Sequence, residues 1–198
     1  MKIEEPDLSG TYSYSDYLTW QWTEMAELIH GKIYKMSPAP TSIHQKVSGR
    51  LFLEIGNFLK GKKCQLFSAP FDVRLPLSPK KNSDREITTV VQPDLCVVCD
   101  PSKIDERGCL GAPDWIIEIL SRHTSAKDLR EKFDVYEEAG VREYWVVHPQ
   151  EQTVLIYSLD EKGKYESLLK PLVSTDAVTP MTLPGLTIQL ADVFPPED

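Results

Sequence analysis

The sequence predicts an α/β or α+β layered domain with a mixed central sheet. From Ser42 onward, the hydrophobic patterns indicate the order helix, three strands, helix, strand. The unit between Trp115 and His148 is strand–helix–strand, which implies a right-handed crossover and two parallel strands in one sheet. The 198 residues and 41% hydrophobic composition are enough for a single domain, residues 1–198, with a sizeable core.

Residues 1–40 are expected to form an N-terminal arm and a hairpin in front of this core. The string AELI-HG-KIYKM predicts two short strands that turn at His30-Gly31. A capping-box pattern at residues 42–45 then begins a long helix, which Gly61 closes. The apolar positions that predict this helix are Ile43, Val47, Leu51, Ile55 and Phe58 or Leu59.

Three strands are expected after this helix. Residues 66–76, LFSAPFDVRLP, alternate apolar and polar side chains and predict one strand, in which Pro70 indicates a sheet edge. Residues 88–100, TTVVQPDLCVVCD, predict the second strand. Residues 114–120, DWIIEIL, predict the third.

The second half of the domain contains one more long helix. It is expected to begin at Ser125 and to end at Gly140, a typical C′ residue. Residues 142–149 and 151–159 each predict a strand, and residues 159–198 are expected to hold C-terminal strands and a tail.

The composition is that of an acidic, well-mixed chain. A net charge of −8 and a pI of about 5.1 argue against a broad nucleic-acid-binding surface, although a local basic patch is compatible with them. No apolar run approaches the ~20 residues of a membrane helix. The N-terminal string MKIEEPDLSG has no apolar h-region, so no signal peptide is expected and the predicted location is the cytoplasm.

The cysteines are expected to be reduced and buried. The second and third have the C-x-x-C spacing of metal and redox sites, but they fall inside the apolar string LCVVC and no second pair accompanies them. Buried thiols also fit a cytoplasmic protein. The four cysteines are Cys64, Cys96, Cys99 and Cys109.

Two carboxylates interrupt strands that otherwise belong to the core. They are Asp94, in QPDLCVV, and Glu118, in WIIEIL. If their strands pair, the carboxylates converge, and two close carboxylates repel each other unless a cation lies between them. A hard divalent ion, Mg²⁺ or Mn²⁺, suits oxygen ligands of this kind. Such an ion activates water and stabilises charge on a phosphoryl group.

Lys132 is the candidate cation for the same site. On the helical wheel it flanks the buried stripe Leu129, Phe133 and Tyr136, so its long side chain can reach over the end of the sheet. The alternative is a surface ion pair with Asp128, four residues earlier on the same helix. The spacing alone favours neither.

Four more side chains are candidates for this site. Glu27, at the head of the hairpin, would hold a second metal or its water, or is an exposed strand-end glutamate. His44, in the first turn of the first long helix, would act as a base or a phosphate contact, or is a neutral helix-start histidine. Asp72 would line the cleft, and Gln92 would reach the substrate or lie in a polar pocket.

The segment after Glu118 offers substrate contacts. Ser121 would bind phosphate with its hydroxyl, although the beginning of a turn is the favoured interpretation. Arg122 belongs to a local basic cluster that would contact the phosphate backbone, or forms part of a solvated helix face. The other members of this cluster are His123, Lys127 and Arg130.

The pair P-D at residues 93–94 followed by E-I-L at residues 118–120 resembles the PD-(D/E)XK nuclease superfamily. The core of that superfamily is a helix, three strands, a helix and a strand. Its lysine normally lies two residues after the second acid, where this chain has Leu120. In some branches the lysine has moved to the following helix, and Lys132 would then replace it.

A more specific resemblance covers nearly the whole chain. It is to the bacterial family of putative restriction endonucleases of the Uma type. This resemblance implies a restriction-endonuclease-like core at residues 42–158, Asp94 and Glu118 as Mg²⁺ ligands, and Lys132 as the phosphate- or water-orienting cation. The strings that carry it are AELIHGKIYKMSPAP, VVQPDLCVVCD, GAPDWIIEILSRHTSAKDLREKFDVYEEAGVREYWVVHP and TVLIYSL.

The predicted function is therefore hydrolysis of DNA phosphodiester bonds by a metal-activated water. A homodimer is expected, because an acidic monomer would bind DNA weakly and two sites suit double-strand cleavage. The alternative is an inactive nuclease fold that binds nucleic acid or protein, which Leu120 favours. A hydrolase of another phosphate ester is a third possibility, whereas the lack of a glycine-rich phosphate loop argues against a nucleoside triphosphatase.

Overall fold

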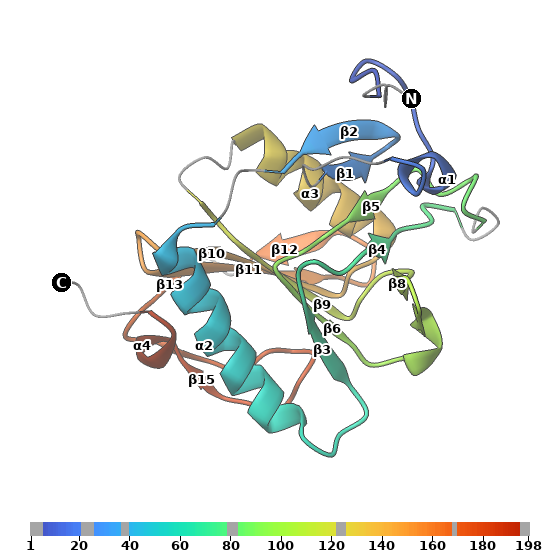
Figure 1. Cartoon of the computed structure of the whole chain (residues 1–198). Helices are drawn as coiled ribbons and strands as arrows, with labels where there is room; N and C mark the ends of the chain where they lie inside the picture. The colour runs from blue at the N-terminus through green and yellow to red at the C-terminus, as the bar shows by residue number, and fades with distance from the viewer. Residues whose placement is uncertain are drawn as a thin grey trace.

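The computed structural model describes residues 6–20, 26–36, 40–78, 83–121, 126–167 and 170–194, without the side chains of residues 126–128. Most of its strands belong to two mixed sheets (Figure 1). None of the helices in these ranges is long and apolar enough to cross a membrane. The helices are α1 (Tyr14–Tyr17), α2 (Ser42–Leu59), α3 (Ala126–Ala139) and α4 (Leu190–Val193), with a short 3-10 helix at Pro101–Lys103.

The larger sheet has the order β12-β11-β10-β9-β6-β3, and β13 pairs with β11. Strands β9 and β10 are parallel and are joined by α3, while the other pairs in this sheet are antiparallel. The predicted mixed sheet with a strand–helix–strand crossover is therefore confirmed. Its strands are β3 (Gln65–Ser68), β6 (Leu95–Val98), β9 (Trp115–Ile119), β10 (Glu143–His148), β11 (Thr153–Leu159), β12 (Tyr165–Ser167) and β13 (Leu172–Val173).

The smaller sheet has the order β2-β1-β5-β4-β8-β7 and includes the predicted N-terminal hairpin. A separate pair, β14 (Ala177–Val178) and β15 (Ile188–Gln189), lies near the C-terminus. The strands of the smaller sheet are β1 (Ala26–Ile29), β2 (Lys32–Lys35), β4 (Val73–Arg74), β5 (Val90–Val91), β7 (Ile104–Asp105) and β8 (Gly108–Leu110).

The larger sheet is covered by α2 on one face and α3 on the other (Figure 1). Side chains alternate along β9, so Ile117 and Ile119 join the core with α2, while Ile116 joins the core with α3. Glu118 follows the same alternation and contacts Tyr136 of α3. The position of this acid on the α3 face is therefore a direct consequence of the strand period.

Two segments predicted as single strands are each divided between the two sheets. Residues 66–76 split into β3 of the larger sheet and β4 of the smaller, and residues 88–100 split into β5 and β6. The breaks contain Pro70, which follows a cis peptide bond, and Pro93. Proline cannot donate a hydrogen bond to a ladder, so each break is a natural place to leave a sheet. The edge position predicted from Pro70 holds for β3, the last strand of its sheet, but not for β4, which lies between β5 and β8.

The ends of α2 and α3 agree with the sequence, whereas the start of α2 does not. The N-cap of α2 is Thr41, whose hydroxyl accepts a hydrogen bond from the amide of His44, so the capping box predicted from Ser42 is wrong. Gly61 and Gly140 follow α2 and α3 with φ angles of 74° and 81°, as expected for residues that close helices. The predicted start of α3 at Ser125 lies outside the described residues.

The prediction of four reduced cysteines is wrong for two of them. Cys64 and Cys99 form a disulfide, whereas Cys96 and Cys109 are free and buried. The register explains the pair: Gln65 lies opposite Val98 in the β3–β6 ladder, so the residues one step further out face each other. The C-x-x-C spacing was therefore uninformative, because Cys99 pairs with Cys64 while Cys96 is free.

Glu143 connects the C-terminal segment to the larger sheet. Its carboxylate is buried at the first residue of β10 and accepts hydrogen bonds from the indole of Trp145 at 2.9 Å and from the amide of Thr182 at 2.7 Å. The amide of Met181 donates to it at 3.1 Å. This carboxylate lies at the end of the sheet away from Glu118, since Glu143 pairs with Trp115 at the beginning of β9.

We expect Glu143→Ala to lower the free energy of unfolding by about 3 kcal/mol, because buried donors lose a charged acceptor. Urea unfolding followed by tryptophan fluorescence measures the change. Glu166→Ala, at an exposed position of β12, is the control and should leave the free energy nearly unchanged. Equal effects of the two substitutions would show that Glu143 does not hold the C-terminal segment.

Candidate functional site

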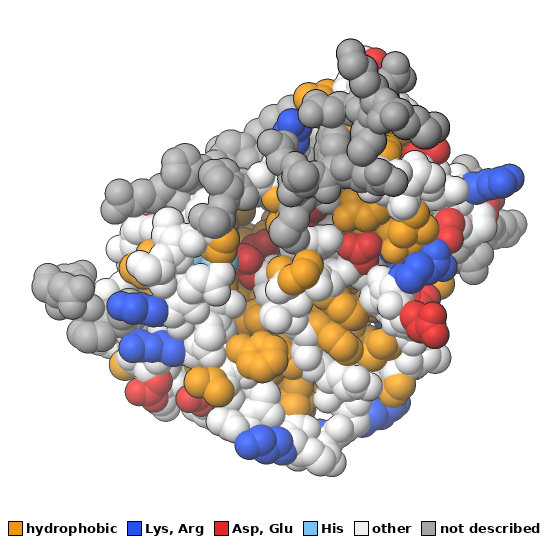
Figure 2. All heavy atoms as spheres, viewed as in Figure 1, with side chains coloured by type: hydrophobic (Ala, Val, Ile, Leu, Met, Phe, Trp, Pro, Cys, Tyr) orange, Lys and Arg blue, Asp and Glu red, His pale blue; other side chains and the backbone are white. Residues whose placement is uncertain are grey.

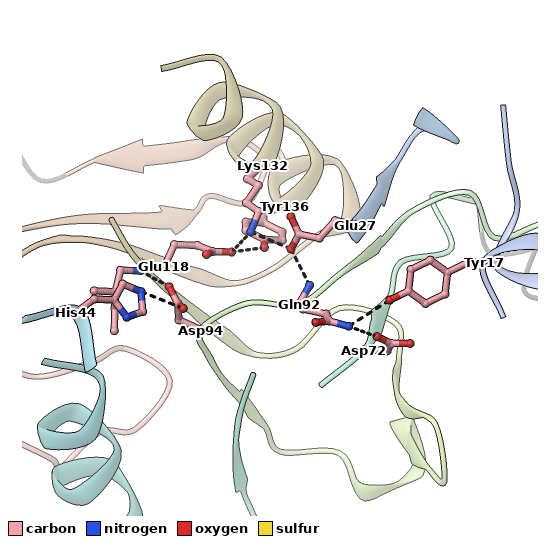
Figure 3. A network of polar contacts seen from close by, with 10 residues as sticks. Tyr17, Glu27, His44, Asp72, Gln92, Asp94, Glu118, Lys132 and Tyr136 are labelled. Atoms are coloured by element: carbon pink, nitrogen blue, oxygen red, sulfur yellow. Dashed lines mark hydrogen bonds and ion pairs between the residues drawn. The ribbon is translucent and has the colours of Figure 1, made fainter. Parts of the chain in front are cut away.

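Glu118 is the centre of a polar cluster at the end of β9. Its Oε1 accepts hydrogen bonds from Lys132 Nζ at 2.9 Å and from the Tyr136 hydroxyl at 2.7 Å (Figure 3). Lys132 and Tyr136 are four residues apart on α3, so both lie on the helix face that covers the sheet. The strand and the helix therefore meet through a buried acid with two donors.

Lys132 also joins the smaller sheet to this cluster. Its Nζ lies 3.0 Å from Oε1 of Glu27, a buried residue of β1, and the same Oε1 accepts the backbone amide of Gln92 at 2.8 Å. The Lys132 side chain is only 15% exposed, which contradicts the alternative of a solvated surface residue. Glu27 is likewise not the exposed strand-end glutamate that the sequence left open.

Asp94 lies immediately before β6 and faces the cluster from the neighbouring strand. The β6–β9 register pairs Leu95 with Ile117, so the next step places Asp94 opposite Glu118. Its Oδ2 accepts the backbone amide of Ile119 at 2.7 Å. Its Oδ1 lies 3.2 Å from Nε2 of His44, which is buried in the first turn of α2. The convergence of the two acids, expected from their strands, is therefore present.

Burial and neighbouring charges set the protonation of this cluster. Burial raises the pKa of Glu118 to about 7; Lys132 opposes this rise, and the charges of Asp94 and Glu27 add to it. Burial by itself would lower the pKa of Lys132, but the two glutamates outweigh it and raise that pKa, so the ammonium keeps its charge. For His44, burial is outweighed by the hydrogen bond and charge of Asp94, which raise its pKa.

A second polar group lies behind Glu27, toward α1. Gln92 Nε2 donates to Asp72 Oδ1 at 2.8 Å and to the Tyr17 hydroxyl at 3.2 Å, and the Tyr14 hydroxyl donates to Asp72 Oδ2 at 3.1 Å. Figure 3 shows Asp72 directed toward Tyr17 and away from Asp94 and Glu118. Tyr14 and Tyr17 were not predicted as site residues, and the only signal for them in the sequence is the run of aromatic residues between Tyr12 and Trp22.

A cavity of about 1410 Å³ opens over the acids. Figure 2 shows acidic side chains at the bottom of a hollow with a histidine beside them. Asp72 does not line the cavity but accepts a hydrogen bond from Gln92, which does. Arg122 lies outside the described residues. The predicted site residues that line the cavity are Glu27, His44, Gln92, Asp94, Glu118, Ser121 and Lys132.

The donor set fits a hard divalent cation. Within the described ranges, no three His, Cys, Asp or Glu residues gather closely enough to hold a metal ion alone. Mg²⁺ needs only one or two carboxylates, since water fills its remaining positions, and Asp94 and Glu118 offer those. Gln92 adds an amide oxygen, Oε1, which is buried and has no hydrogen-bond partner among the described residues. These oxygen atoms suit Mg²⁺ or Mn²⁺ better than zinc, which prefers nitrogen and sulfur.

Comparisons with known proteins agree with the fold. Residues 14–191 match the model of the Uma2 family, described as a putative restriction endonuclease. The uncharacterised protein slr1290 of Synechocystis sp. is 26% identical over 156 residues, which cover 77% of each protein. The crystal structure of a putative nuclease belonging to DUF820 from Anabaena variabilis has a TM-score of 0.70 and 23% identity, and the match covers 92% of this chain and 97% of that one.

We expect Lys132→Met to destabilise the protein by about 3–5 kcal/mol at pH 8, because Glu118 and Glu27 would stay buried without their cation. The loss should shrink as the pH is lowered. A carboxyl group whose pKa is raised in the folded state binds its proton there first, so folding gains stability toward acid pH. Urea unfolding between pH 6 and 8 measures this trend. Lys164→Met, which removes an exposed ammonium paired with Glu137, is the control and should show neither effect.

Proposed function

The chain belongs to the Uma2 family, described as a putative restriction endonuclease, and we propose that it is a divalent-metal-dependent endonuclease acting on DNA. One observation carries the proposal: Asp94 and Glu118 converge in an open cavity beside the protonated amine of Lys132. The structural neighbour from Anabaena variabilis, a putative nuclease, has the same fold and supports it.

The acids and the lysine have distinct roles in this proposal. Asp94 and Glu118 would hold Mg²⁺ or Mn²⁺, which when bound supplies a nucleophilic water and offsets phosphate charge. The ammonium of Lys132 is directed into the cavity and would stabilise the negative charge that develops on the attacked phosphate. The distance of 2.9 Å to Glu118 keeps this charge beside the acid.

The remaining polar residues would position this set. Glu27 binds Lys132 from the smaller sheet and would fix where the ammonium lies, while its role in holding a second metal or its water stays a prediction. His44 would hold the Asp94 carboxylate at the correct angle, and Tyr136 would do the same for Glu118. Ser121, next to the strand end, lines the cavity and would contact phosphate.

Location and assembly stay predictions. A homodimer would bring two such sites to the two strands of DNA, and light scattering after size exclusion tests it. Cys64 and Cys99 form a disulfide, and such bonds are rare in the cytoplasm, so the cysteines do not support that location.

The rival proposal is an inactive nuclease fold that binds nucleic acid or protein. It was favoured by Leu120 at the usual lysine position. The amine of Lys132 lies against Glu118, so a cation is present in the site although it comes from α3. This observation favours the enzyme.

We expect the wild-type protein to cut plasmid or oligonucleotide DNA only when Mg²⁺ or Mn²⁺ is present. Lys132→Ala and Glu118→Gln should each lower the rate at least a hundredfold, since they remove the charge stabilisation and a metal ligand. Gel analysis of cleavage products measures the rates. Lys164→Ala removes an exposed lysine outside the cavity and should leave the rate unchanged. Cutting that persists in EDTA or in both site variants would refute the proposal.

We also expect the affinity for Mn²⁺ to fall at acid pH. Glu118 has a pKa of about 7 in the folded protein, so below that pH its proton competes with the ion. The affinity should drop about tenfold per pH unit below 7 and level off above it, as measured by calorimetry. Glu118→Gln, which binds no proton in this range, should bind weakly with little pH dependence. A flat profile in the wild type would exclude Glu118 as a ligand.

A further inference from the structure

The cavity continues from the acids along an apolar wall. On α2, the side chains of Phe52 and Leu53 line it and are 39% and 61% exposed. Ala69 and Pro70, from the link between β3 and β4, line it as well. Figure 2 shows hydrophobic side chains gathered on this face beside the hollow that contains the acids. Exposed apolar surface inside a cavity indicates contact with a ligand.

The cavity is larger than the proposed chemistry requires. Its volume of about 1410 Å³ exceeds the ~300–1,000 Å³ of ordinary small-molecule pockets. A phosphodiester and a hydrated cation would occupy only the end that contains Asp94 and Glu118. Phosphate groups gain nothing from the apolar remainder, whereas the flat face of a nucleobase does.

The charge of the cavity differs from that of the whole chain. The chain carries −8, yet among the described residues that line the cavity the cations outnumber the acids. Such a distribution attracts a short stretch of phosphate backbone and offers little to a long duplex lying over the rest of the surface. The cations are Lys35, Lys46, Arg50 and Lys132, and the acids are Glu27, Asp94 and Glu118.

Helix geometry places the aromatic ring at a useful distance from the reacting group. His44, Ser48 and Phe52 are spaced four residues apart on α2 and line the cavity along one face of the helix. His44 contacts Asp94, and Phe52 follows about 12 Å further along the axis. A nucleotide that flanks the scissile phosphate can therefore bring its base to Phe52.

We propose that this wall binds an unpaired nucleotide next to the scissile phosphate, with its base against Phe52 and its phosphates near Lys46 and Arg50. The substrate is then single-stranded or locally unpaired DNA, because a base inside a duplex does not expose its face to a side chain. This inference rests on the proposed function, since the same cavity must receive DNA.

The test compares binding of one labelled oligonucleotide, single-stranded or paired with its complement, by fluorescence anisotropy in EDTA. The wild-type protein should bind the single strand at least tenfold more tightly. Phe52→Ala should weaken single-strand binding about tenfold through lost stacking, and Phe52→Trp should preserve it. Met181→Ala, which shortens another exposed apolar side chain outside the cavity, is the matched control and should bind normally.

The salt dependence separates the two kinds of contact. The plot of log affinity against log salt concentration has a negative slope. Lys46→Ala or Arg50→Ala should make this slope shallower by about 0.7 for each phosphate contact removed. Phe52→Ala should leave this slope unchanged, since stacking releases no counterions. Slopes that are the same in all three variants would overturn the assignment of the two cations.

Other outcomes overturn the inference as a whole. Duplex binding as tight as single-strand binding, or normal binding by Phe52→Ala, would refute it. If Phe52→Ala instead converts a dimer into monomers with unchanged DNA affinity, the wall belongs to a second copy of the chain. Failure of the proposed function is distinguishable: no DNA would be cut with Mg²⁺ or Mn²⁺, while the preference for single strands and its dependence on Phe52 would remain.

Discussion

The site depends on one buried ammonium group held between two carboxylates. Lys132 of α3 lies 2.9 Å from Glu118 of β9 and 3.0 Å from Glu27 of β1. Each of these groups would be costly to bury alone, so each is tolerated only while the other two are in place. The larger sheet, the smaller sheet and the crossover helix are therefore fixed relative to one another at the point where the cavity opens.

The path of the chain between the two sheets creates that opening. The chain passes from β3 of the larger sheet to β4 of the smaller near Pro70. It returns from β5 of the smaller sheet to β6 of the larger at Pro93. Gln92 and Asp94 flank Pro93 at the second break, between β5 and β6, where the residues belong to neither strand. The side chain of Gln92 serves the smaller sheet, while Asp94 accepts the amide of Ile119 in the larger. The break at Pro93 thus supplies the side chains of Gln92 and Asp94 to the site.

The sequence by itself determined the local elements and the nature of the reacting groups. The apolar stripe of α2, the glycines that close α2 and α3, and the crossover between β9 and β10 all follow from periodicity, which depends only on neighbouring residues. Asp94 and Glu118 stood out because a carboxylate in an apolar strand needs a partner. The helical wheel made Lys132 a candidate for the site or for a surface ion pair with Asp128, and the family resemblance favoured the site.

Only the tertiary structure decided which residues meet. Glu27 and Lys132 are far apart in the chain, and no local pattern showed that their charges would pair. The division of two predicted strands between two sheets, the bond between Cys64 and Cys99, and the tyrosines behind Gln92 were hidden for the same reason. Periodicity reports which face of an element is buried, whereas long-range pairing depends on how the elements pack, which no single segment encodes.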